Sequence, residues 1–196
     1  MRKAGLALMA YFFFDFRDAQ KQHRRDLLSS LLFQLSARSD ACHRIFARFY
    51  LDHDEGAQQP SDDELSKCLT DMLKVEGQPP TYIIIDALDE SPNISGMPTA
   101  REKVLQFLEE LVGSQLPNAR LCVSSRTEID IRSILEPLAR FRVSLHEESG
   151  QWQTSLDSSN QSYIPTEICE DGRKRTRSWS SIHYLRRPTE CKYFRP

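Results

Sequence analysis

The sequence lacks the features that define several protein classes. No run of apolar residues approaches the length of about eighteen that a membrane-spanning helix needs, so we expect no membrane segment. The five cysteines are scattered and include no Cys-x-x-Cys pair, which argues against a zinc site or a disulfide framework and favours reduced thiols in a cytoplasmic protein. No internal repeat is visible.

Two further absences concern polyanionic ligands. Residues 1–150 carry 18 basic and 23 acidic side chains, a mildly acidic balance that argues against a nucleic-acid groove. None of the seven glycines is followed by lysine, so the chain has no Gly-x-x-x-x-Gly-Lys-Ser/Thr loop, whose backbone amides and lysine bind phosphates. The nearest approach, Gly172-Arg173-Lys174, follows no predicted strand.

The N-terminal segment permits two interpretations. Residues 1–3 followed by the apolar run 4–14 imitate a secretory signal peptide. The same residues also fit a buried strand from Leu6 to Phe16. Asp15 and Arg17 interrupt the apolar run, so we favour the strand.

Strands and helices are predicted to alternate along residues 1–150. Ser61 and Glu64, like Thr99 and Glu102, have the spacing of a capping box, which opens a helix. Strands are expected at 6–16, 82–85, 120–125 and an edge strand at 141–145, and helices at 20–37, around 45–50, and at 61–73, 99–112 and 129–138. This alternation predicts an α/β domain with a doubly wound parallel sheet and right-handed crossovers.

The most informative stretch joins an apolar run to a group of carboxylates. Residues 82–85 form an unbroken apolar run, typical of a strand buried on both faces. Asp86, Asp89 and Glu90 follow directly. Ligands of open α/β sheets bind at the carboxyl ends of the strands, where a nucleotide-hydrolysing domain holds Mg²⁺. The alternative is a buried strand followed by a solvated acidic turn.

Each of these residues suits one role in phosphoryl transfer. Asp86 is the candidate Mg²⁺ ligand, acting through a metal-bound water. Glu90 is the first candidate for the base that orients the attacking water, and Asp89 is the second. Arg126 follows the next predicted strand, directly after Ser124-Ser125, and is placed to reach a γ-phosphate. An arginine on the surface after a strand is the alternative for Arg126.

Three segments together carry a family resemblance. Residues 86–90 after the isoleucine strand resemble the Walker B segment of NACHT domains, in the signal-transducing (STAND) class of P-loop ATPases. Residues 11–18 and 23–32 resemble the strand and helix that follow the P-loop helix in fungal nephrocystin-like NACHT proteins. Ser124-Ser125-Arg126 is similar to their sensor strand. The resemblance covers residues 2–151.

The resemblance implies a partial P-loop NTPase core over residues 1–150, with Mg²⁺ and ATP as ligands. In that family the P-loop lies just upstream of the matching residues, and nucleotide-dependent switching is coupled to oligomerisation, often with repeats downstream. Two functional classes stay open. The chain is either a fragment of a nucleotide-dependent signalling switch, not catalytic by itself, or a non-catalytic interaction module that self-associates or binds protein partners.

Residues 151–196 differ from the rest in composition. Residues 155–162 are polar and residues 173–187 are basic, with neither an apolar helical stripe nor an alternating strand. We expect a disordered tail. The alternatives are a basic partner-binding arm and a shifted reading frame, because suitable codons for residues 171–182, read one base earlier, would encode a helix-like segment.

Overall fold

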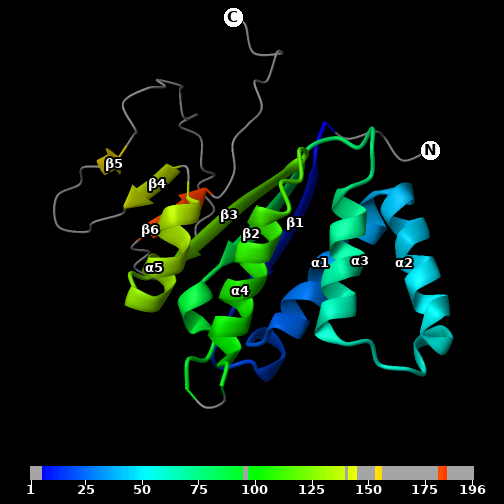
Figure 1. Cartoon of the computed structure of the whole chain (residues 1–196), viewed down its shortest axis with the longest axis horizontal. Helices are drawn as coiled ribbons and strands as arrows, with labels where there is room; N and C mark the ends of the chain where they lie inside the picture. The colour runs from blue at the N-terminus through cyan, green and yellow to red at the C-terminus, as the bar shows by residue number, and fades with distance from the viewer. Residues whose placement is uncertain (1–5, 95–96, 140, 145–152, 156–180, 185–196) are drawn as a thin grey trace, which may run out of the picture.

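The computed structural model describes residues 6–94, 97–139, 141–144, 153–155 and 181–184, and shows a mixed α/β architecture (Figure 1). Its six-stranded sheet has the order β1-β2-β3-β6-β4-β5. The strands are β1 (Leu8–Phe13), β2 (Thr81–Asp86), β3 (Ala119–Ser125), β4 (Phe141–Ser144), β5 (Gln153–Ser155) and β6 (Ser181–Tyr184). The helices are η1 (Ala19–Lys21), α1 (Arg24–Arg38), α2 (Asp40–Asp52), η2 (Asp54–Gly56), α3 (Asp62–Leu73), η3 (Leu88–Glu90), α4 (Ala100–Gly113) and α5 (Ile129–Leu138).

The first three strands form the parallel part of the sheet, as the alternating pattern predicts. Tyr11 of β1 pairs with Ile84 of β2, and Ile84 pairs with Cys122 of β3. Both predicted capping boxes are present: the Ser61 and Thr99 side chains accept from the amides of Glu64 and Glu102. These caps satisfy amides that the first turns of α3 and α4 leave without a helical partner.

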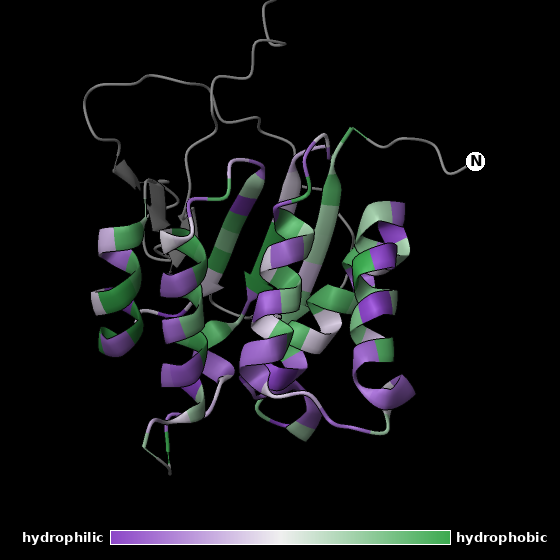
Figure 2. Ribbon diagram, turned by 45° about the vertical axis from the view of Figure 1, so that its right-hand side comes forward, coloured by the Kyte–Doolittle hydropathy of each residue, from purple (hydrophilic) through white to green (hydrophobic). Residues whose placement is uncertain are grey.

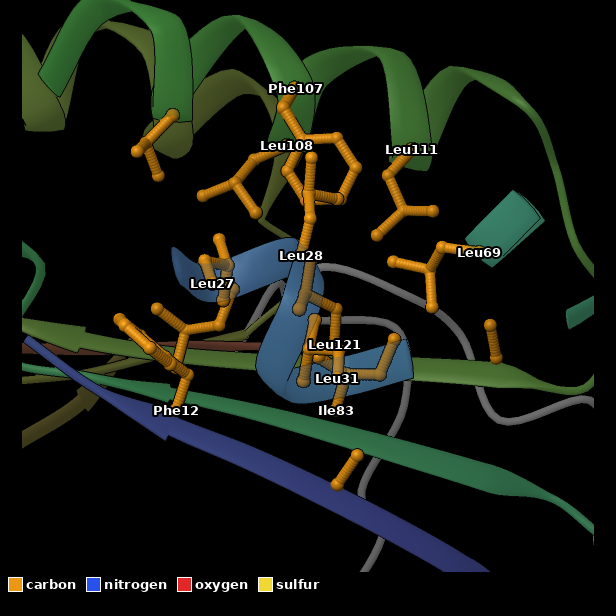
Figure 3. Packing of buried hydrophobic residues seen from close by; sticks show 14 of the residues in the cluster. Phe12, Leu27, Leu28, Leu31, Leu69, Ile83, Phe107, Leu108, Leu111 and Leu121 are labelled. Carbon is orange, nitrogen blue, oxygen red and sulfur yellow. The ribbon is translucent and has the colours of Figure 1, made fainter. Parts of the chain in front are cut away.

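The core lies between one face of the parallel strands and the helices. Figure 3 shows Leu28 of α1 between Phe107 and Leu108 of α4 on one side and Ile83 and Leu121 of the sheet on the other. Figure 2 shows the helices in front of the strands, with many hydrophilic residues on the surfaces turned toward the viewer. Burial of this continuous apolar layer is the main force that holds the domain together.

The other face of the parallel strands contradicts one sequence prediction. The run 82–85 was expected to be buried on both faces, but Tyr82 and Ile84 are 45% and 37% exposed, whereas Ile83 and Ile85 are buried. Met9 and Tyr11 of β1 are 50% and 57% exposed on the same side. Within the described residues, the helices therefore cover one face of the sheet, and the doubly wound arrangement is not seen.

The ends of the chain differ from prediction in smaller ways. The first strand spans six residues, because the backbone turns after Phe14 into η1, and the first long helix begins only at Arg24. The strand β4 pairs with both β5 and β6, so it is not an edge strand.

The short strands β5 and β6 lie within residues 151–196, where the sequence pattern predicts no strand. The sequence pattern misses them because such short strands take their hydrogen bonds from β3 and β4 rather than from any local periodicity. The other residues of the tail, with the predictions made for them, lie outside the described residues. No helix in the described part of the chain is long and apolar enough to cross a membrane.

Candidate functional site

Asp86 and Arg126 lie at the same edge of the sheet, as predicted. Asp86 is the last residue of β2, and Arg126 directly follows β3, its parallel neighbour. Ser124 connects the two strands, because its hydroxyl donates to Oδ1 of Asp86. The same hydroxyl accepts from the amide of Ala87 at 3.4 Å, and Ala87 has a left-handed backbone (φ +56°) that turns the chain sharply after the strand.

Asp89 contacts Arg126 directly. Its Oδ2 lies 3.0 Å from Nε of Arg126, and its Oδ1 accepts from the backbone amide of Arg126 at 2.8 Å. The Asp89 side chain is only 5% exposed, whereas that of Arg126 is 61% exposed. A buried carboxylate with two charge-assisted contacts is held in one orientation. Asp89 therefore positions both the backbone amide and the guanidinium of Arg126.

Glu90 faces the first strand instead. It is 8% exposed, and its Oε2 accepts from the backbone amide of Phe16 at 3.3 Å. Phe16 belongs to the segment after β1 and is itself 61% exposed. The structure thus separates the three carboxylates: Asp86 lies toward Ser124, Asp89 toward Arg126, and Glu90 toward the segment after β1.

Arg101 of α4 holds this acidic segment in place, a role that sequence reasoning missed. Its guanidinium donates to the carbonyls of Asp89 at 2.6 Å and Ser91 at 3.1 Å, and it pairs with Asp130 of α5 at 3.1 Å. Arg101 is 8% exposed. In the sequence it is an ordinary charged residue inside a capping box, and nothing local indicates that it reaches back to the loop.

The donor atoms at this edge suit a hard cation only in part. A carboxylate and a hydroxyl, at Asp86 and Ser124, are oxygen donors of the kind that Mg²⁺ accepts. The described residues contain no group of three or more metal-binding side chains. Mg²⁺ commonly binds one or two carboxylates and completes its shell with waters and substrate phosphates, so Asp86 and Ser124 fit a metal that arrives with a phosphate.

A cavity of about 550 Å³ lies elsewhere, among the helices, and none of the four predicted residues lines it. Arg24 of α1 lines it, donates to Asp63 at 3.1 Å and Ser66 at 2.7 Å on α3, and lies 5.7 Å from the ring centre of Phe107 on α4. We interpret this cavity as the polar seam where three helices meet, because its buried arginine connects all three.

The fold and site define a mixed α/β domain that gathers carboxylates and an arginine at the carboxyl edge of three parallel strands. The family model described as Nephrocystin 3, N-terminal matches residues 1–126, and the chain belongs to that family. The match includes all four predicted site residues and ends at Arg126. No curated protein matches the chain, and no solved structure does.

Proposed function

We propose that this chain is the larger part of a nucleotide-dependent signalling switch of the NACHT type, and that it is not catalytic by itself. The observation that supports the proposal is that Asp86, Asp89, Glu90 and Arg126 all lie at or just after the carboxyl ends of β2 and β3, which are adjacent parallel strands. Membership of the nephrocystin N-terminal family agrees with it. In the proposed parent protein, a preceding P-loop supplies the phosphate cradle.

Each residue has a distinct proposed task at that edge. Asp86, oriented by the Ser124 hydroxyl, would hold Mg²⁺, and the metal would supply positive charge beside the phosphates. Asp89 positions Arg126, whose exposed guanidinium stabilises negative charge on the γ-phosphate. Glu90 accepts a proton from the attacking water. Its present contact with the Phe16 amide does not exclude this, since catalytic contacts often form only with substrate bound.

The second candidate function is a non-catalytic interaction module. It is favoured by the contacts that all three carboxylates already make within the chain, and by the uncovered apolar face of the sheet. A module of this kind would bind protein partners, or a second copy, without nucleotide.

Calorimetric titration with Mg²⁺–ATP tests the first part of the proposal. We expect weak binding or none, because carboxylates without an anion cradle hold hydrated Mg²⁺ loosely. A micromolar dissociation constant would contradict the proposal and reveal a phosphate site within the chain.

The genomic DNA upstream of the Met1 codon decides between the two functions. Codons for Gly-Lys-Ser/Thr in frame favour the switch, and transcripts that start at Met1 without them favour the interaction module. With an upstream P-loop restored, Asp86→Ala should impair nucleotide binding, and Glu90→Gln should preserve binding but stall hydrolysis. Equal hydrolysis rates in wild type and Glu90→Gln would move the base to Asp89.

A further inference from the structure

The cavity among α1, α3 and α4 contains a buried arginine that does not use all of its donors. The Arg24 side chain lines the cavity and is only 9% exposed. Its Nη2 donates to Asp63 and Ser66, whereas its buried Nε has no partner and its Nη1 has none among the described residues. Buried polar groups are normally hydrogen-bonded. The cavity therefore offers donors for an acceptor that the described part of the chain does not supply.

The two neighbouring helices each add a donor to the same cavity. Ser66 of α3 accepts from Arg24 through Oγ, so its own hydroxyl hydrogen is available. Lys103 of α4 also lines the cavity, and no described residue accepts from its ammonium group. Figure 1 shows α1 between α3 and α4, so the three donors come from three adjacent helices. An arginine, a lysine and a hydroxyl together suit a carboxylate, which accepts several charge-assisted hydrogen bonds.

The charges of the lining balance in a way that favours a ligand with both signs of charge. Asp63 pairs with Arg24, and Asp62 pairs with Arg25 at 2.8 Å. Among the described residues, this leaves one unpaired cation, Lys103, and one unpaired anion, Glu110, whose Oε1 accepts only from Gln106 at 3.1 Å. A simple anion would leave Glu110 uncompensated, and a simple cation would leave Lys103 so.

We propose that this cavity binds a small zwitterion whose carboxylate and ammonium groups are separated by several methylene groups. The carboxylate accepts from Arg24 and Lys103, the methylene groups lie along Gln106, and the ammonium group donates to Glu110. Lys103 and Glu110 are seven residues apart on α4, which is about 10 Å along the helix axis. The cavity volume of about 550 Å³ lies within the range of about 300–1,000 Å³ that small-molecule sites occupy.

NMR titration of the whole chain, followed at assigned backbone amides, tests the proposal with a series of ω-amino acids. The probes are glycine, γ-aminobutyrate and ε-aminocaproate, in which the two charges are progressively further apart. We expect ε-aminocaproate to shift the amides of α1, α3 and α4 with a dissociation constant of about 1 mM, because partly exposed charges bind weakly. Glycine should bind at least about fivefold more weakly, since its charges are too close to reach both Lys103 and Glu110. Caproate, which lacks the ammonium group, and hexylamine, which lacks the carboxylate, should be weakened to a similar extent.

Variants of α4 test each end of the site separately. Lys103→Met removes the cation and Glu110→Gln the anion, and each should weaken the binding of ε-aminocaproate about fivefold. The matched controls are Lys67→Met on α3 and Glu109→Gln on α4, both at exposed residues outside the cavity lining, and these variants should bind like wild type. Arg24 is left unchanged, because it also joins α1 to α3.

Three results would overturn the proposal. The first is the absence of a saturable shift up to about 20 mM ε-aminocaproate, well above the expected dissociation constant. The second is caproate or hexylamine binding as tightly as ε-aminocaproate, which would make the site one for a simple ion. The third is binding that both Lys103→Met and Glu110→Gln leave unchanged, which would place the ligand elsewhere. The titrations contain neither nucleotide nor Mg²⁺, so their outcome is independent of the proposed switch.

Discussion

Replacement of Arg101 by methionine should destabilise the whole domain through the loop that carries the candidate site. The guanidinium joins α4 to the Asp89 and Ser91 carbonyls and to Asp130 on α5. Methionine keeps much of the apolar part of the side chain and is as good a helix former as arginine. It removes all of these hydrogen bonds. The change thus isolates the polar contacts of Arg101.

The magnitude follows from the burial of the partners. Two backbone carbonyls lose a charged donor in a site where the arginine side chain is only 9% exposed, and each loss costs about 1–2 kcal/mol. Asp130 is 31% exposed and regains water, so it adds little. We expect a loss of about 2–4 kcal/mol in the free energy of unfolding.

Urea denaturation followed by circular dichroism measures this loss. With a slope of about 2 kcal/mol per molar urea, the midpoint should fall by about 1–2 M. The matched control is Arg132→Met on α5, which removes an exposed pair with Glu136 and should leave the midpoint almost unchanged, because water screens that pair. A loss below about 1 kcal/mol for Arg101→Met would refute the reasoning, since it would mean that water replaces the guanidinium at both carbonyls.

Three other predictions concern the edge strand, a helix cap and a buried thiol. Gln34→Leu should speed hydrogen exchange at the Tyr11 amide about tenfold. The Gln34 side chain accepts from the amide of Tyr11 and donates to its carbonyl, at the outer edge of β1. Unchanged exchange would contradict this role. The backbone amide of Ser61 donates to the Glu64 carboxylate and lowers the pKa of Glu64 below its usual 4.5. The stability that this cap contributes is therefore complete above pH 4.5 and is lost as the pH falls through the lowered pKa. NMR titration should show the α3 amides shifting with Glu64 in that acidic range, and a titration midpoint at or above 4.5 would be inconsistent with the cap. Burial raises the pKa of Cys68 to about 11, so at pH 8 iodoacetamide should modify Cys122 well before Cys68, and equal rates would show that α3 opens readily.

Local features of the sequence determined the elements of this domain and their order. The capping boxes at Ser61 and Thr99 could be predicted because each involves residues only three positions apart. The apolar run 82–85 and the carboxylates after it predicted a strand that ends in polar residues. The helices between successive strands predicted that the first three strands are parallel, as they are. The common edge shared by Asp86 and Arg126 follows from that topology alone.

Only the tertiary structure decided which face of each strand is covered and which partner each charge takes. Tyr82 and Ile84 look buried in the sequence, because an apolar run does not reveal whether a helix packs on both sides. Asp89 and Glu90 are adjacent carboxylates, yet one contacts Arg126 and the other the Phe16 amide. Such pairings join residues far apart in the chain, and they form only after hydrophobic burial has brought the strands and helices together.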